Sequence, residues 1–114
     1  MKPVCLVLGA GAGIGGTVAR RFAQEGYHAC LCRRSDAEGL KRLVDVRAVD
    51  GNSASGFILN AIEQVAIEGR VAAIEAEIGP IEVVVYNLGA QIGDRALKDT
   101  SAKAFETGWR LGTF

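Results

Sequence analysis

Residues 4–16 read VCLVLGAGAGIGG and predict how the chain begins to fold. The first five residues, Val4 to Leu8, form a continuous apolar run rich in branched side chains, which is typical of a short strand buried on both faces. Glycines follow at once. A helix is then predicted from about Ile14 to Glu25, with Gly26 at its end. Its apolar residues lie on one stripe, which comprises Ile14, Val18, Ala19, Phe22 and Ala23. The stretch therefore predicts a strand, a glycine-rich turn and a helix.

Strands and helices alternate along the remaining sequence. The predicted elements are a strand at 28–32, a helix from the S-x-x-E capping box at 35–38 to about 49, a strand at 54–59, a helix at 63–78, a strand at 81–86 and a helix that begins near 101. This order predicts the α/β class: a doubly wound Rossmann-type parallel sheet of about four strands with helices on both faces. We expect residues 1–114 to form a single, incomplete domain of this kind.

Composition excludes several classes of function. Lys plus Arg and Asp plus Glu both number 13, so no net charge favours nucleic acid or an anionic membrane as a partner. No apolar run approaches the roughly 20 residues of a transmembrane helix, and the run after Lys2 is too short for a signal peptide. We therefore expect a cytoplasmic protein.

The three cysteines, Cys5, Cys30 and Cys32, cannot all pair within one chain. Because they lie inside apolar runs, we expect buried thiols in a reducing compartment, with no metal bound. The alternative is a zinc site, since His28, Cys30 and Cys32 alternate along one predicted strand and Cys5 could complete the set.

Parallel sheets bind ligands at the carboxyl ends of their strands, where the first candidate site is the glycine-rich turn. Glycines let the backbone approach a pyrophosphate, and the following helix offers free N–H groups and its positive dipole end. Three patterns fit: G-x-G-x-x-G at Gly11, Gly13 and Gly16; G-x-x-x-G-x-G at Gly9, Gly13 and Gly15, which we prefer; and G-x-G-x-G at Gly9, Gly11 and Gly13, as in methyltransferases that use S-adenosylmethionine. The predicted contacts are Gly9, Gly11, Ala12, Gly13, Ile14 and Gly15.

The second candidate site follows the second strand, where Arg33 and Arg34 stand. Enzymes that bind NAD, and methyltransferases, use an acidic residue there to hold ribose hydroxyls. A guanidinium instead suits a 2′-phosphate through charge-assisted hydrogen bonds. The two arginines therefore favour NADP over NAD and argue against a methyltransferase.

With these motifs, the whole chain resembles the N-terminal half of a short-chain dehydrogenase/reductase. The Gly9-x-x-x-Gly13-Ile14-Gly15 turn matches the cofactor loop of that family. Asn60-Ala61 falls where the family has an Asp-hydrophobic pair that contacts adenine, and Asn can still hydrogen-bond an amino group. Tyr86-Asn87-Leu88-Gly89 falls where the family has Asn-Asn-Ala-Gly. The resemblance thus implies that Asn60, Ala61, Asn87, Leu88 and Gly89 also line the cofactor cleft.

The resemblance also implies a Tyr-x-x-x-Lys pair for reduction, and these 114 residues contain none. Tyr27 and Tyr86 are followed four residues later by Leu31 and Ala90, and Gly112 aligns with the helix Asn of the family's proton relay. We therefore assign no catalytic residue. We expect the cofactor half of a truncated oxidoreductase that transfers hydride between NADP and a carbonyl or alcohol.

Two alternatives remain open for the function. One is a non-catalytic module that senses NADP or scaffolds a partner, and the other is a methyltransferase fragment. In the oxidoreductase interpretation, the fourth strand would be an apolar edge without its next neighbour. We therefore expect the isolated chain to self-associate.

Overall fold

The computed structural model describes residues 2–10, 13–49, 53–61, 63–88 and 96–112. Strands and helices alternate as the sequence predicts, and most boundaries agree to within one residue. The elements are β1 (Val4–Leu8), α1 (Ile14–Gln24), β2 (His28–Arg33), α2 (Ala37–Val49), β3 (Ala54–Ile58), α3 (Gln64–Glu77), β4 (Ile81–Tyr86), the 3-10 turn η1 (Leu97–Asp99) and α4 (Ala102–Gly112).

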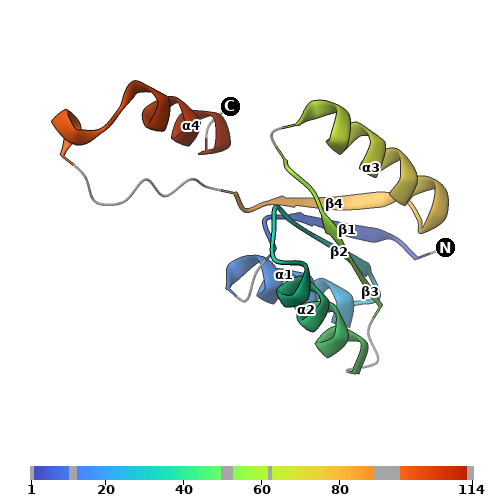
Figure 1. Cartoon of the computed structure of the whole chain (residues 1–114). Coiled ribbons are helices and arrows are strands. Elements are labelled where there is room, and N and C mark those ends of the chain that lie inside the picture. The colour runs from blue at the N-terminus through green and yellow to red at the C-terminus, as the bar shows by residue number, and fades with distance from the viewer. Residues whose placement is uncertain (1, 11–12, 50–52, 62, 89–95, 113–114) are drawn as a thin grey trace.

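The four strands form one parallel sheet in the order β3-β2-β1-β4. Helices α1 and α2 cover one face of this sheet and α3 covers the other (Figure 1). In register, Val4 pairs with His28 on one side and with Ile81 on the other. The predicted Rossmann-type parallel sheet is therefore confirmed, and all four strands end at the same edge.

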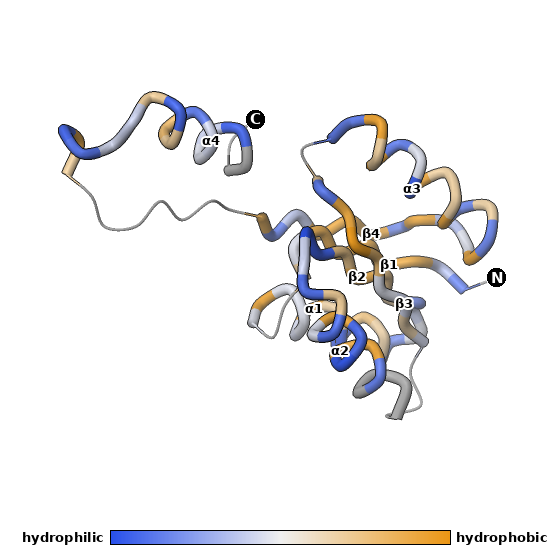
Figure 2. Tube along the Cα trace, in the orientation of Figure 1, coloured by the Kyte–Doolittle hydropathy of each residue, from blue (hydrophilic) through white to orange (hydrophobic). Residues whose placement is uncertain are grey.

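The core lies on both faces of the central strands, which are among the most hydrophobic segments of the chain (Figure 2). All five residues of β1 are buried, as expected for a strand covered on two sides. Beneath α1 and α2, Ala19, Ala23 and Leu40 pack against the sheet. On the opposite face, Ile74 of α3 packs against a second cluster, with Ile67, Val71 and Ile78 at its margin.

The cysteines are free and buried, as the sequence predicts, but they are divided between these two clusters. Cys5 lies under α1, whereas Cys30 and Cys32 lie under α3. Burial raises the pKa of the Cys30 thiol to about 12 and that of Cys5 and Cys32 to about 11. Because the sheet separates Cys5 from the other two thiols, the zinc interpretation is wrong.

Two local expectations are also wrong. Ile14 does not join the packed stripe of α1, since it lies in the first turn at the edge of the sheet and is 71% exposed. The residue that caps α2 is not Ser35 but its neighbour Asp36, whose Oδ1 accepts a hydrogen bond of 3.0 Å from the Gly39 amide. Asp36 adopts a φ of +63°, a conformation that Asp tolerates better than most residues.

Helix α4 covers neither face of the sheet (Figure 1), but its Arg110 lines one pocket with Leu8 and Tyr86, the last residues of β1 and β4. It begins after Ser101, whose Oγ accepts a hydrogen bond of 3.1 Å from the Ala104 amide. Phe105 and Trp109 are exposed on it. Within the described ranges, the structure has no helix with the length and hydrophobicity needed to span a membrane.

Candidate functional site

The candidate site lies at the edge where the four strands end, and backbone hydrogen bonds hold its segments together. The amides of Gly9 and Ala10 donate to the Cys32 carbonyl at 3.0 and 2.9 Å, which joins the glycine-rich turn to the end of β2. The Leu59 amide donates to the Arg33 carbonyl at 2.7 Å, and the Asn87 amide donates to the Leu8 carbonyl at 2.9 Å. The four segments singled out from the sequence are thus neighbours in space.

Two glycines of the turn are required by close approach of other backbone atoms. Gly9 has a φ of +90°, which favours glycine, and a Cβ there would collide with the Asn87 carbonyl. A Cβ on Gly15 would lie 2.5 Å from the Gly9 oxygen. Gly13, in contrast, has open space around its Cα. This packing of Gly9 and Gly15 agrees with the G-x-x-x-G-x-G pattern.

The start of α1 lies at the same edge of the sheet, and neither its N-cap residue nor its first turn provides a negatively charged side chain. Gly13 is the N-cap residue and provides no side chain to cap the helix. The first turn contains no acidic residue, so the positive end of the helix dipole is not offset from within that turn. This local chemistry suits an anionic group. Gly11 and Ala12, also predicted contacts, lie outside the described residues.

At the end of β2, the two arginines have different surroundings. Arg33 is half-buried, and its Nη2 lies 3.6 Å from Asp36 Oδ2. Arg34 is exposed and has no ion pair within the described parts of the chain. Asp36 is not among the site residues that the sequence motifs predict. Its signal was an Asp three residues before Gly39, which is the spacing of a side-chain cap at a helix start.

The remaining predicted residues follow β3 and β4. Asn60 and Ala61 are half-buried in the turn before α3, where the backbone carbonyl of Asn60 accepts a hydrogen bond of 3.0 Å from the Glu63 amide. Asn87 Nδ2 lies 3.5 Å from the Gly9 oxygen, and Leu88 packs at the margin of the cluster under α3. Gly89 lies outside the described residues.

A separate polar cluster lies at the opposite edge of the sheet, where β2 begins. His28 is hydrogen-bonded through Nδ1 to Ser53 Oγ and through Nε2 to Ser55 Oγ, the latter at 2.8 Å. Burial, and secondarily the charge of Lys2, lower the pKa of His28 from its ordinary value of 6.5. A neutral ring satisfies both contacts, since one nitrogen donates and the other accepts. The cluster therefore joins the start of β2 to the start of β3 and to the residue that precedes β3.

Known proteins share this fold and sequence pattern. A family model described as short chain dehydrogenase matches residues 3–111. Gluconate 5-dehydrogenase of Gluconobacter oxydans is 37% identical over 86 residues, which cover 75% of this chain and 33% of that protein. The 2,3-dihydro-2,3-dihydroxybenzoate dehydrogenase of Bacillus subtilis is 33% identical over 86 residues, or 75% of this chain and 33% of that protein. The chain spans about a third of the length of such curated relatives.

Solved structures agree. The citronellol catabolism dehydrogenase AtuB of Pseudomonas aeruginosa is 35% identical with a TM-score of 0.83, covering 95% of this chain and 43% of that one. ElxO with NADP bound is 26% identical with a TM-score of 0.83, covering 96% of this chain and 44% of that one.

Proposed function

Because this chain belongs to the short-chain dehydrogenase/reductase family, we propose that its residues bind NADP for an oxidoreductase reaction. The observation that carries the choice of NADP is the arginine pair after β2. Gly9 and Ala10 are hydrogen-bonded to the Cys32 carbonyl, and Arg33 and Arg34 follow immediately in the sequence. A cationic pair thus adjoins the turn that would hold a diphosphate.

In this proposal, main-chain amides from Gly11 to Gly15 and the N-terminus of α1 bind the diphosphate. The amides of Gly9 and Ala10 donate to the Cys32 carbonyl instead, and Gly9 serves the site by letting the turn approach Asn87 closely. The bare glycine backbone and the absence of an acidic residue in the first turn of α1 suit such a group. Our assignment includes Gly11, Ala12 and Ile14 within this stretch.

Arg33 and Arg34 bind the 2′-phosphate through charge-assisted hydrogen bonds. Asn60 and Ala61 contact the adenine, while Asn87, Leu88 and Gly89 line the cleft. The NADP complex of ElxO, a relative in structure and sequence, supports the assignment of the cofactor.

When bound, NADP supplies or accepts a hydride at its nicotinamide ring. We assign these 114 residues to cofactor binding and not to catalysis, because they contain no Tyr-x-x-x-Lys. Hydride transfer to a carbonyl, or from an alcohol, is proposed for the complete enzyme. A non-catalytic NADP-binding module remains the second candidate, favoured by the same missing pair, whereas family membership removes the methyltransferase alternative.

Three further assignments accompany this proposal. The 114 residues form part of one domain, since a single sheet contains all four described strands and the chain spans about a third of the length of its curated relatives. A reducing compartment such as the cytoplasm suits the three free, buried thiols. The chain self-associates through the apolar surface of β4, where Val84 and Tyr86 are exposed.

Titration with NADPH and NADH, followed by cofactor fluorescence, tests the choice of cofactor. We expect tighter binding of NADPH, and about tenfold weaker NADPH binding in Arg34→Ala, the loss expected for a charge-assisted hydrogen bond. Arg42→Ala is the matched control, because Arg42 is exposed on α2 and has no ion pair among the described residues. Equal affinity for the two cofactors, or an equal loss in both variants, would remove the assignment of NADP.

A further inference from the structure

We propose that Asp36 is a specificity-determining residue of this site, because its carboxylate competes with the 2′-phosphate of NADP for Arg33. The competition reduces the preference for NADP over NAD. This inference rests on the proposed function and adds to it a protein anion that the sequence motifs did not indicate.

The first observation is the ion pair itself. Arg33 Nη2 lies 3.6 Å from Asp36 Oδ2, and the Arg33 side chain is 27% exposed. Each of the other two arginines with a described ion pair, Arg21 and Arg110, has a side chain that is more than half exposed. The Asp36 side chain is 52% exposed, so the lower exposure of this pair lies on the arginine side, where water and salt screen the charge less.

The second observation is that the Asp36 carboxylate is held in place. Its Oδ1 accepts the hydrogen bond from the Gly39 amide, and its backbone adopts the left-handed conformation. A Cβ on Gly39 would collide with Oδ2 and lie 2.9 Å from Arg33 Nη1, so a glycine at this position leaves room for the pair.

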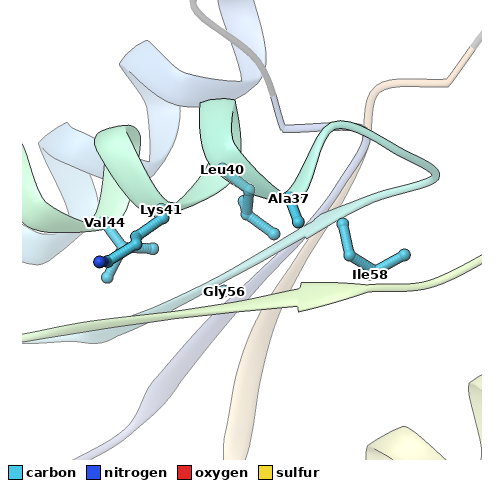
Figure 3. Close-up of a pocket in the computed structure, with 6 residues that line it drawn as sticks. All are labelled: Ala37, Leu40, Lys41, Val44, Gly56 and Ile58. Atoms are coloured by element: carbon cyan, nitrogen blue, oxygen red, sulfur yellow. The ribbon is translucent and has the colours of Figure 1, made fainter.

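Packing of α2 against β3 fixes the helix that carries this cap. Leu40 and Val44 point toward Gly56 of β3 (Figure 3). A Cβ on Gly56 would lie 2.9 Å from Leu40 Cγ and 3.0 Å from Val44 Cγ2, so the helix lies close to the strand. Asp36 therefore stays at the end of β2.

The third observation concerns Arg33. Its carbonyl accepts from the Leu59 amide, and the preceding Cys32 carbonyl accepts from Gly9 and Ala10, so the backbone of Arg33 is fixed beside the glycine-rich turn. Its guanidinium, in contrast, meets Asp36 at a distance longer than a good hydrogen bond. A phosphate can form shorter, bidentate contacts with the same group.

It follows that NADP and NAD affect the Arg33–Asp36 ion pair differently in the same site. The 2′-phosphate of NADP draws Arg33 from Asp36, and loss of that ion pair reduces the net gain in binding. NAD brings only a 2′-hydroxyl, so the Arg33–Asp36 pair persists when it binds. Arg34 has no such competitor among the described residues and contributes the larger share of phosphate affinity.

Asp36→Asn in the 114-residue chain tests the inference. Asn keeps an oxygen for the Gly39 amide and tolerates the left-handed conformation, but it carries no charge. We expect NADPH to bind about threefold more tightly, in line with the energy of a partly exposed ion pair, and NADH binding to stay unchanged. Circular dichroism verifies the fold of the Asp36→Asn variant.

Glu38→Gln is the matched control, since Glu38 is the acidic residue in the first turn of α2 and is exposed. It should change NADPH affinity less than Asp36→Asn does. In an Arg33→Ala background, Asp36→Asn should no longer improve NADPH binding, because the guanidinium for which Asp36 and the 2′-phosphate compete is absent.

Three results would overturn the inference: unchanged or weaker NADPH binding in Asp36→Asn, an equal gain in Glu38→Gln, or a gain that persists without Arg33. Failure of the proposed function is recognised separately. In that case the wild-type chain does not prefer NADPH, and Arg34→Ala has no effect on NADPH binding.

Discussion

Gly15 shows how a single missing Cβ shapes the glycine-rich turn. Because a Cβ there would lie 2.5 Å from the Gly9 oxygen and 3.0 Å from Ala10 Cα, Gly15→Ala requires the backbone to move. We expect a loss of about 1–3 kcal/mol in the free energy of unfolding, the range for overpacked sites. Gly13→Ala is the control, since nothing lies within 4 Å of a Cβ at Gly13. Chemical denaturation measures both, and equal stabilities would contradict the described packing.

The lowered pKa of His28 makes the stability of the folded chain depend on pH. Its pKa in the folded chain is lowered by burial and by Lys2, so the folded state resists protonation more than the unfolded state does. The contribution of His28 to stability is therefore complete above its ordinary pKa of 6.5 and decreases as the pH falls below that value.

Thermal unfolding measured at about pH 7.5 and about pH 5.5 tests this sign. The wild-type chain should lose more stability on acidification than His28→Asn, which has no titrating ring. A larger loss in the variant would show that His28 is not the group responsible. Ser53 and Ser55 remain in both proteins, so the comparison isolates the imidazole.

At the scale of elements, α3 contains a residue that weakens it. Gly69 lies inside this helix, is exposed, and has nothing within 4 Å of an added Cβ. Alanine restricts the unfolded backbone and favours the helix, so Gly69→Ala should stabilise the chain by about 0.5–1 kcal/mol.

Gly56→Ala provides the contrast, because a Cβ there would press on Leu40 and Val44 of α2. The two variants should therefore shift the thermal midpoint in opposite directions. Stabilisation by both substitutions would contradict the close packing of Leu40 and Val44 on Gly56.

At the scale of the whole molecule, the described sheet has two edge strands, β3 and β4. On β4, Val84 is 57% exposed and Tyr86 is 52% exposed. Unpaired edges and exposed apolar side chains favour association. We expect light scattering of the 114-residue chain to give a mass above that of a monomer, increasing with concentration.

Val84→Lys should reduce this association, since a charged residue on an edge strand opposes pairing with another strand. Val65→Lys is the control, because Val65 is an equally apolar residue that is exposed on α3. A monodisperse monomer for the wild-type chain would contradict the expected self-association. An equal effect of both lysines would assign it to general hydrophobicity instead of β4.

Much of this fold could be derived from local patterns. The apolar runs at 4–8 and 81–86 and the helical spacing at 64–77 identify their elements, because side-chain periodicity reports directly on which face is buried. The glycine turn and the arginines after β2 could also be found from the sequence, because the residues of each motif are contiguous.

The rest depends on contacts between segments that are distant along the chain. The sheet order separates Cys5 from Cys30 and Cys32, and Gly9 meets Asn87 across 78 positions of sequence. Arg33 and Asp36 are only three positions apart in the sequence. Their ion pair nevertheless depends on the left-handed conformation that Asp36 adopts before α2. Periodicity contains no information on such pairings. Packing selects them, because it determines which backbone atoms and charges can approach one another.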